Sequence, residues 1–218
     1  YSEVFGNIIY NDTVNRNMLS GEYAFLDEVS DSAYVTGRAV VTDYSQRDSV
    51  FMHADTIWAV SYNVDTDSLY RKIKAYHKVS AWSKDMQAVC DSLVFDSRDS
   101  CMTMYRDPIL WNGKQQLLGE KVMVYMNDST IDWAHIENQA LSVERIDSAN
   151  YNQVTGKEMK AFFRDGEMRQ VDVIGSVRLV YYPMERDSTL IGMNISETSQ
   201  LNMFLENRKA TTLAYKKL

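Results

Sequence analysis

The sequence predicts an all-β protein built from repeated antiparallel hairpins. Proline is scarce, with two residues, and glycine is modest, with nine, so most turns need another residue type. The dipeptide Asp-Ser occurs nine times, and both of its side chains hydrogen-bond to nearby backbone groups, which favours turns. Runs of alternating or clustered apolar and β-branched residues separate these dipeptides, as is typical of β-sheet proteins. The nine dipeptides begin at Asp31, Asp48, Asp67, Asp91, Asp96, Asp99, Asp128, Asp147 and Asp187.

The chain contains an irregular internal repeat. Three stretches share Arg-Asp-Ser followed by apolar residues, and glycine-led apolar runs accompany them, so each unit reads as glycine, strand, polar turn and strand. The unequal spacing predicts a stacked array of hairpins rather than a strict solenoid. The Arg-Asp-Ser stretches cover 44–52, 95–104 and 183–193, and the glycine-led runs cover 35–44, 117–131 and 173–182.

Period-two alternation predicts individual strands. In VIGSVRLVYY (173–182), the odd-numbered residues from Val173 to Tyr181 share one face of a strand. The stretch 157–175 reads as a hairpin that turns at residues 164–166, where Gly166 can adopt a positive φ. Residues 15–30 are compatible with a short helix or with a strand.

The two cysteines lie on either side of a predicted turn at 96–99. This turn places Val94 opposite Cys101 and Cys90 opposite Tyr105, so the cysteines stand about 13 Å apart along the strand. A disulfide needs Cα atoms within about 7 Å. We therefore expect both cysteines to be reduced, although a shifted turn would allow a bridge.

Composition narrows the class of protein. A chain of 218 residues, 45% of them hydrophobic, can form one large or two small domains. A net charge of −7 argues against a nucleic-acid partner, and no apolar run reaches the roughly 18 residues of a membrane span. The chain starts at Tyr1 without a visible signal peptide, so its compartment cannot be read directly.

No motif points to catalysis, a metal ion or a cofactor. His53, His77 and His135 stand far apart in sequence and form no metal-ligand pair, and the carboxylates of the Asp-Ser pairs are explained by turn chemistry. The sequence has no nucleophile elbow, phosphate-binding loop or dinucleotide fingerprint. Four Trp and twelve Met residues fit either an ordinary sandwich core or an apolar trough for an alkyl chain.

These patterns together resemble the OstA-like, or LptA, family. The stretches 34–59 and 88–132 resemble its unit of strand, hairpin and glycine-led strand, and 158–213 looks like the long OstA-like proteins of Bacteroidetes-type bacteria. The resemblance rests on the order of the patterns rather than on one motif. Two departures are Lys121, which stands where the other runs have Ala39 and Val177, and the long polar connectors at 60–85 and 133–157.

The resemblance implies a V-shaped, open antiparallel β-jelly-roll, here a single elongated domain over 1–218 with units at about 34–63, 86–132 and 158–213. It also implies a periplasmic, non-enzymatic carrier that holds the acyl chains of lipopolysaccharide in an apolar trough. Other envelope transport proteins of the same fold, and further copies of the chain joined head to tail through edge strands, would be its partners. The alternative is a β-rich cell-envelope interaction scaffold without a lipid ligand, and a jelly-roll sugar enzyme is a more distant third.

The family has no required residues, so trough residues can be predicted only from the inward-facing positions of each unit. An ordinary core explains each of these positions as well. The candidates are Val35, Ala39, Val41, Met52 and Ala54 in the first unit, Leu93, Phe95, Met102 and Met104 in the second, and Val173, Val177, Leu179 and Tyr181 in the third.

Overall fold

The computed structural model describes residues 1–13, 16–44, 48–84, 86–127, 130–185, 189–206 and 209–216. These residues form strands, turns and connecting segments and contain no helix, which confirms the all-β fold class. The chain divides into two compact units, which we call the N-terminal unit (1–108) and the C-terminal unit (109–218). The single elongated domain expected over 1–218 stays a prediction.

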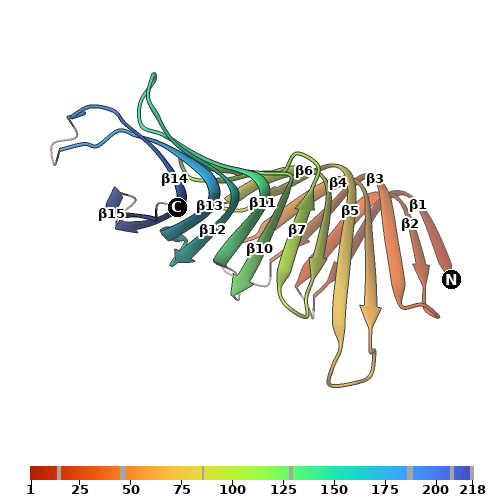
Figure 1. Ribbon diagram of the computed structural model, residues 1–218. Coiled ribbons are helices and arrows are strands. Elements are labelled where there is room, and N and C mark those ends of the chain that lie inside the picture. The colour runs from red at the N-terminus through yellow and green to blue at the C-terminus, as the bar shows by residue number, and fades with distance from the viewer. Residues whose placement is uncertain are drawn as a thin grey trace. The chain divides into compact units, whose positions relative to one another are not determined.

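The N-terminal unit is an antiparallel meander in which each strand pairs with the next (Figure 1). Residues 17–27, for which helix and strand were both possible, form its second strand. The predicted connector at 60–85 is wrong, because it holds the whole fifth strand and the end of the fourth. The strands are β1 (Ser2–Asp12), β2 (Asn17–Asp27), β3 (Ser32–Asp43), β4 (Val50–Tyr62), β5 (Tyr70–Trp82), β6 (Met86–Asp96) and β7 (Cys101–Tyr105).

In the C-terminal unit, six strands pair in chain order from β10 to β15, and the short hairpin β8–β9 joins them through β9 and β11. The predicted connector at 133–157 is also wrong, since it holds most of β11 and the start of β12. The strands are β8 (Ile109–Asn112), β9 (Gln115–Leu118), β10 (Lys121–Asn127), β11 (Thr130–Arg145), β12 (Tyr151–Arg164), β13 (Glu167–Tyr181), β14 (Asn194–Glu206) and β15 (Lys209–Lys216). The turn predicted at 164–166 is confirmed, with Arg164 opposite Glu167 and a φ of 74° at Gly166.

Long strands in both units share one irregularity near their middle. Two consecutive residues with positive φ on one strand oppose a single residue on the neighbouring strand, which is a β-bulge that bends both strands. We call this line of bulges within a unit the corner, and the half-strands on either side of it the two limbs. The pairs are Gly6–Asn7, Gly37–Arg38 and His77–Lys78 in the N-terminal unit, and Asn138–Gln139 and Gly175–Ser176 in the C-terminal unit.

Gly37 and Gly175 lie at bulges of the corner inside strands, so the prediction that they lead strands is wrong. Gly119 comes just before β10, as predicted. Gly37 and Gly175 lie inside β3 and β13, where their φ angles of 77° and 81° suit glycine. Gly119 belongs to a second class with Gly21 and Gly156, which lack a positive φ. A side chain on these glycines would collide with Ile136, Val35 and Val173, respectively, on the adjacent strand. Lys121 is therefore not the counterpart of Ala39 and Val177.

Opposite charges alternate along the corner of the N-terminal unit. Arg38 pairs with Glu22, Lys78 lies 3.8 Å from Asp55, and Arg106 lies 3.1 Å from Asp91. These side chains are mostly exposed, so each pair contributes at most about 1 kcal/mol. Asp91 and Ser92 lie within β6 beside this row, so the prediction that this Asp-Ser pair makes a turn is wrong.

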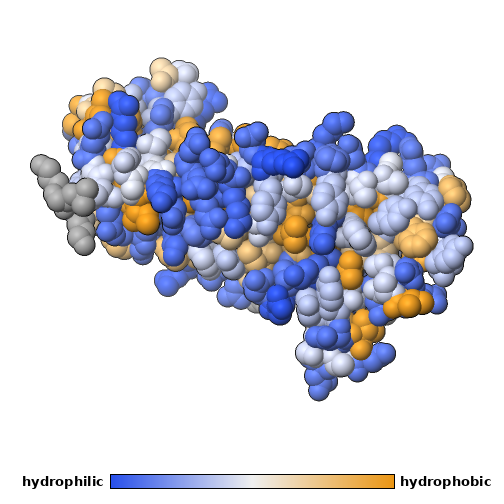
Figure 2. All heavy atoms as spheres, turned by 45° about the vertical axis from the view of Figure 1, so that its right-hand side comes forward, coloured by the Kyte–Doolittle hydropathy of each residue, from blue (hydrophilic) through white to orange (hydrophobic). Residues whose placement is uncertain are grey.

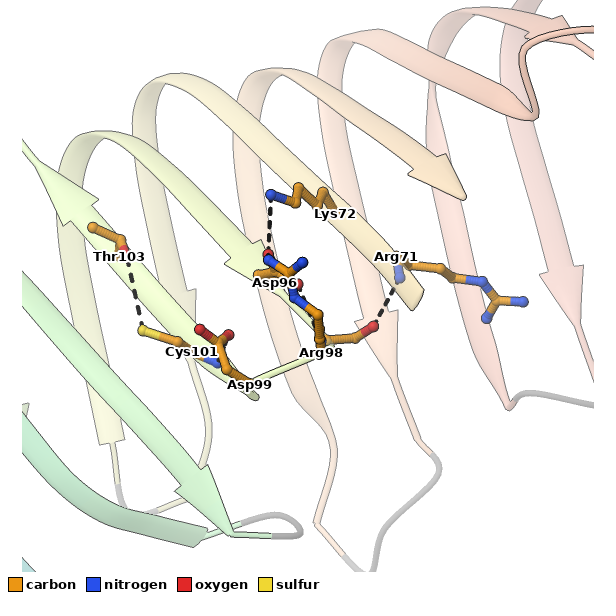
Figure 3. A network of polar contacts seen from close by, with 8 residues as sticks. Arg71, Lys72, Asp96, Arg98, Asp99, Cys101 and Thr103 are labelled. Atoms are coloured by element: carbon orange, nitrogen blue, oxygen red, sulfur yellow. Dashed lines mark hydrogen bonds and ion pairs between the residues drawn. The ribbon is translucent and has the colours of Figure 1, made fainter. Parts of the chain in front are cut away.

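The hairpin around the cysteines turns one residue later than predicted (Figure 3). Cys101 stands opposite Asp96, and Ser92 rather than Cys90 stands opposite Tyr105. The turn is held by Asp96, whose Oδ1 accepts a hydrogen bond from the Arg98 amide, and by Ser97, whose hydroxyl accepts one from the Arg71 amide. Both cysteines are buried, and they are not joined to each other by a disulfide.

The predicted turns at Asp31, Asp67, Asp99 and Asp147 are confirmed as turns or bends. Asp48 also lies at a bend, and Asp96 is the last residue of β6. Asp147 shows the chemistry: its Oδ1 accepts hydrogen bonds from the amides of Ala149 and Asn150. The pairs that begin at Asp128 and Asp187 lie outside the described residues.

Candidate functional site

The inner face of each unit is the sheet face that carries the buried apolar side chains. In the N-terminal unit, the inner row beside the corner is fully buried and runs across five strands through Val35, Ile57, Ala75, Leu93 and Met104. The next inner row, two residues farther from the corner, is only half-buried and holds Ala33, Ala59, Ile73, Phe95 and Met102. The apolar inner face on this limb thus becomes more accessible with distance from the corner.

The opposite limb shows the same trend on β3 and β4. Ala39 and Ala54 are paired beside the corner and have no exposed surface, whereas Val41 and Met52, the next inner pair, are half-buried. Apolar side chains that stay partly accessible on an inner face are the kind of lining that ligand sites have.

The C-terminal unit holds a pocket of about 130 Å³. Val171 and Leu179 both line it, although they lie on the same strand on opposite sides of the bulge at Gly175. The two limbs of β13 therefore face each other across this pocket. Apolar cavities of similar size, about 150 Å³, bind small hydrocarbons.

The pocket walls divide by limb. One limb contributes Met168, Val171, Met203 and Leu205, all nearly buried. The other limb contributes Val154 and Leu179 near the corner and a polar group that begins opposite Val154 and extends away from the corner. This polar group consists of Ser142, Glu144, Asn152 and Tyr181.

Hydrogen bonds hold part of the polar group in place. Asn152 donates from Nδ2 to Glu144 Oε2 over 3.0 Å, and its Oδ1 accepts a hydrogen bond from the Tyr182 amide over 2.9 Å. Burial raises the pKa of Tyr181, and the negative charge of Glu144 adds to the shift. The Tyr181 phenol is therefore neutral at physiological pH.

The structure places all thirteen predicted trough residues on inner faces. Leu179 and Tyr181 line the pocket, and Val173 and Val177 lie beside the corner of the same strand. The buried members are Val35, Ala39, Ala54, Leu93, Met104, Val173, Val177 and Leu179, and the half-buried members are Val41, Met52, Phe95, Met102 and Tyr181. Their role in binding lipid stays a prediction.

Other pocket residues were missed. Met203 and Leu205 alternate with polar or exposed neighbours in LNMFLE (201–206), and this period-two signal could have identified them. Glu144 and Asn152 show no such alternation. They lie on either side of a turn, and the sequence does not determine which residues this turn places opposite each other.

The three histidines lie apart from the pocket. His53 is half-buried on β4, His77 lies at the corner 3.4 Å from Asp91, and His135 Nε2 lies 3.5 Å from Glu158. Within the described ranges, no three His, Cys, Asp or Glu side chains are grouped as metal ligands would be.

The first strand of the N-terminal unit carries several exposed large apolar side chains. Phe5 and Ile9 are more than two-thirds exposed, and Tyr10 is more than half exposed. In the space-filling view, hydrophobic atoms are interspersed with hydrophilic ones at this end of the unit (Figure 2). The first strand pairs with β2 along one side, and in the described part of the chain its other side has no partner strand.

Comparison with known proteins does not assign the chain to a family. No family model matches the sequence, and no curated protein matches it significantly. Among the residues that the structure describes, no helix is long and apolar enough to cross a membrane.

Proposed function

We propose that this chain is a carrier module of the OstA-like, or LptA, type, which binds the acyl chains of lipopolysaccharide between its limbs. The observation that carries the proposal is the pocket of the C-terminal unit, where residues on both sides of one bulge, such as Val171 and Leu179, line a common apolar space. Each limb supplies one wall, as in a V-shaped, open jelly-roll.

The partly accessible inner rows of the N-terminal unit also support acyl-chain binding. Phe95 and Met102 face inward beyond a filled corner and keep part of their surface accessible. An alkyl chain that covers this surface gains about 0.8 kcal/mol per methylene group removed from water. Such binding needs no catalytic group, so the proposed module is not an enzyme.

The remaining parts of the proposal concern the cell envelope. The open side of β1 can accept a strand from another protein of the same fold or from a second copy of this chain. Head-to-tail addition of strands would extend the inner face from one molecule to the next. A protein with this task would act in the periplasm, between the two membranes.

Paired photo-crosslinking tests the proposal. A photoreactive phenylalanine analogue is placed at Phe95 or Met102, which face inward, and in matched controls at Val94 or Thr103, their outward-facing neighbours. We expect purified lipopolysaccharide to form adducts at the inner positions at least about tenfold more often than at the outer ones.

Equal labelling of inner and outer positions in folded variants would contradict the carrier function. Absence of adducts at every inner position would favour the alternative, a cell-envelope interaction scaffold whose interior takes no lipid. Circular dichroism of each variant separates these outcomes from misfolding.

A further inference from the structure

We propose that the pocket of the C-terminal unit selects amphiphiles whose polar end is uncharged or cationic and donates hydrogen bonds, and that it rejects amphiphiles ending in a carboxylate. This inference rests on the proposed function for the apolar part of the ligand. It adds the chemistry of the polar end that the pocket accepts.

The charge of the pocket wall supports this selection. Among the described residues that line the pocket, Glu144 is the one charged side chain, and no Lys, Arg or His is present to offset it. The other polar side chains, including Gln115, Ser142 and Asn152, are uncharged. A carboxylate ligand would therefore meet a negative charge without a cation.

The hydrogen-bonding capacity of Glu144 points the same way. An ionised carboxylate offers about four acceptor sites and donates none. Asn152 uses a site on Oε2, and Oε1 has no hydrogen bond from Asn152. A ligand hydroxyl or ammonium group can donate to the remaining sites, whereas a ligand carboxylate cannot.

The surroundings strengthen the effect of this charge. Leu179 and Val154 are buried beside the polar group, and Met168 and Leu205 form the facing wall. Electrostatic interactions are stronger beside such apolar walls than in water. Tyr181 is neutral at physiological pH, so it contributes a phenol hydroxyl and no charge.

Isothermal titration calorimetry with three eight-carbon probes tests the selection. Octanol, octylammonium and octanoate share one chain length, and at neutral pH they are neutral, positive and negative. We expect the wild-type protein to bind octanol and octylammonium at least about tenfold more tightly than octanoate, a difference of about 1.4 kcal/mol. Equal affinities, or a preference for octanoate, would overturn the proposal.

Three variants locate the effect. Glu144→Gln keeps the shape of the side chain and removes its charge, so octanoate should bind within about threefold of octanol. Glu197→Gln makes the same change on an exposed side chain of β14 and should leave the wild-type ratio intact. Ala210→Phe fills the pocket from β15 and should weaken all three probes.

The outcomes separate this inference from the proposed function. An unchanged octanol-to-octanoate ratio in folded Glu144→Gln would overturn the role of Glu144, while acyl binding would stand. If no probe binds the wild-type protein, the selection proposal fails, and crosslinking at Phe95 and Met102 then decides the carrier function separately. If Glu144→Gln does not fold, the order of the three probes on the wild-type protein still decides the selection.

Discussion

Replacing Gly156 with alanine tests the close packing at the corner. A β-carbon at this position would lie under 3.0 Å from Val173 Cγ1 and 3.1 Å from the carbonyl oxygen of Ile174. Val173 has no exposed surface, so its side chain cannot move into solvent. Extra atoms in a tightly packed core cost about 1–3 kcal/mol. The alanine also restricts the unfolded chain, which offsets about 0.4–1 kcal/mol.

We therefore expect Gly156→Ala to lower the free energy of unfolding by about 1–2 kcal/mol, combining overpacking with the unfolded-state effect. Urea denaturation followed by circular dichroism measures this change as a lower midpoint with an unchanged slope. Gly192→Ala is the matched control. A β-carbon at Gly192 meets no atom within 4 Å, so this substitution should be neutral or slightly stabilising.

A double-mutant cycle identifies the colliding atom. Val173→Ala removes Cγ1, so adding Gly156→Ala to that variant should cost less than adding it to the wild type. The coupling energy should be at least about 0.5 kcal/mol, as for residues in direct contact. If Gly156→Ala is as stable as Gly192→Ala, or if the two changes at the corner are additive, the close approach of β12 and β13 is refuted.

Three further predictions concern the corner and the hairpin turn of the N-terminal unit. His77 has a φ of 61° at the position where β3 and β13 have glycine, so its backbone is strained. His77→Gly should therefore leave the stability unchanged or raise it by up to about 1 kcal/mol. A clearly lower urea midpoint would contradict this backbone strain. Burial raises the pKa of the Cys90 thiol to about 11 from 9.0, so the folded state keeps a proton that the unfolded state loses, and stability falls between these pH values. This loss of stability at alkaline pH should be smaller in Cys90→Ala. Equal slopes of stability against pH in the two proteins would refute the prediction. Burial opposes ionisation of Asp96, but the Arg98 amide and the Lys72 ammonium outweigh it and hold the pKa of this carboxyl below its ordinary 3.8. Asp96 therefore stabilises the fold above that pH and loses this contribution as the pH falls through and below it. Asp96→Asn should lose less stability at acidic pH than the wild type does. An equally steep fall of stability at acidic pH would contradict this role of Asp96.

Strands and turns were predictable where the two-residue period is unbroken. In β13, Val173 and Val177 are four residues apart and share the inner face, because the two-residue bulge at Gly175–Ser176 keeps the alternation in phase. The polar turn after Arg164 was equally clear, since Asp165 and Gly166 both suit positive φ.

On the neighbouring strands, the two-residue period is broken at the corner, so the same reasoning fails there. Ala54 and Ile57 are three residues apart and both face inward, since the bulge on β3 leaves the single residue Asp55 out of the ladder between Ala54 and Thr56. Strict alternation would assign one of them to the outer face. Asp91 plays the part of Asp55 on β6, which explains why an Asp-Ser pair stands inside a strand. Across the corner, inner residues are therefore four apart on a strand that carries the two-residue bulge and three apart on a strand that faces it. This pair of spacings is the sequence signal of the corner.

Side chains far from the corner were less predictable. Glu144 and Asn152 meet because the turn around Asp147 sets the register of β11 against β12, and this register follows from several hydrogen bonds of Asp147 and Asn150. A hairpin register that differs by one residue, as it did around the cysteines, would direct them to different partners.

Methyl spectroscopy of the native methionines tests acyl binding on the inner face most directly. Met52 and Met102 face inward in the N-terminal unit, whereas Met18, on β2, and Met123, between the buried Val122 and Val124 of β10, face outward. Lipopolysaccharide carrying a nitroxide on an acyl chain should broaden the methyl resonances of Met52 and Met102 and spare those of Met18 and Met123. Broadening of the outer methyls with the inner ones unchanged would contradict the carrier account.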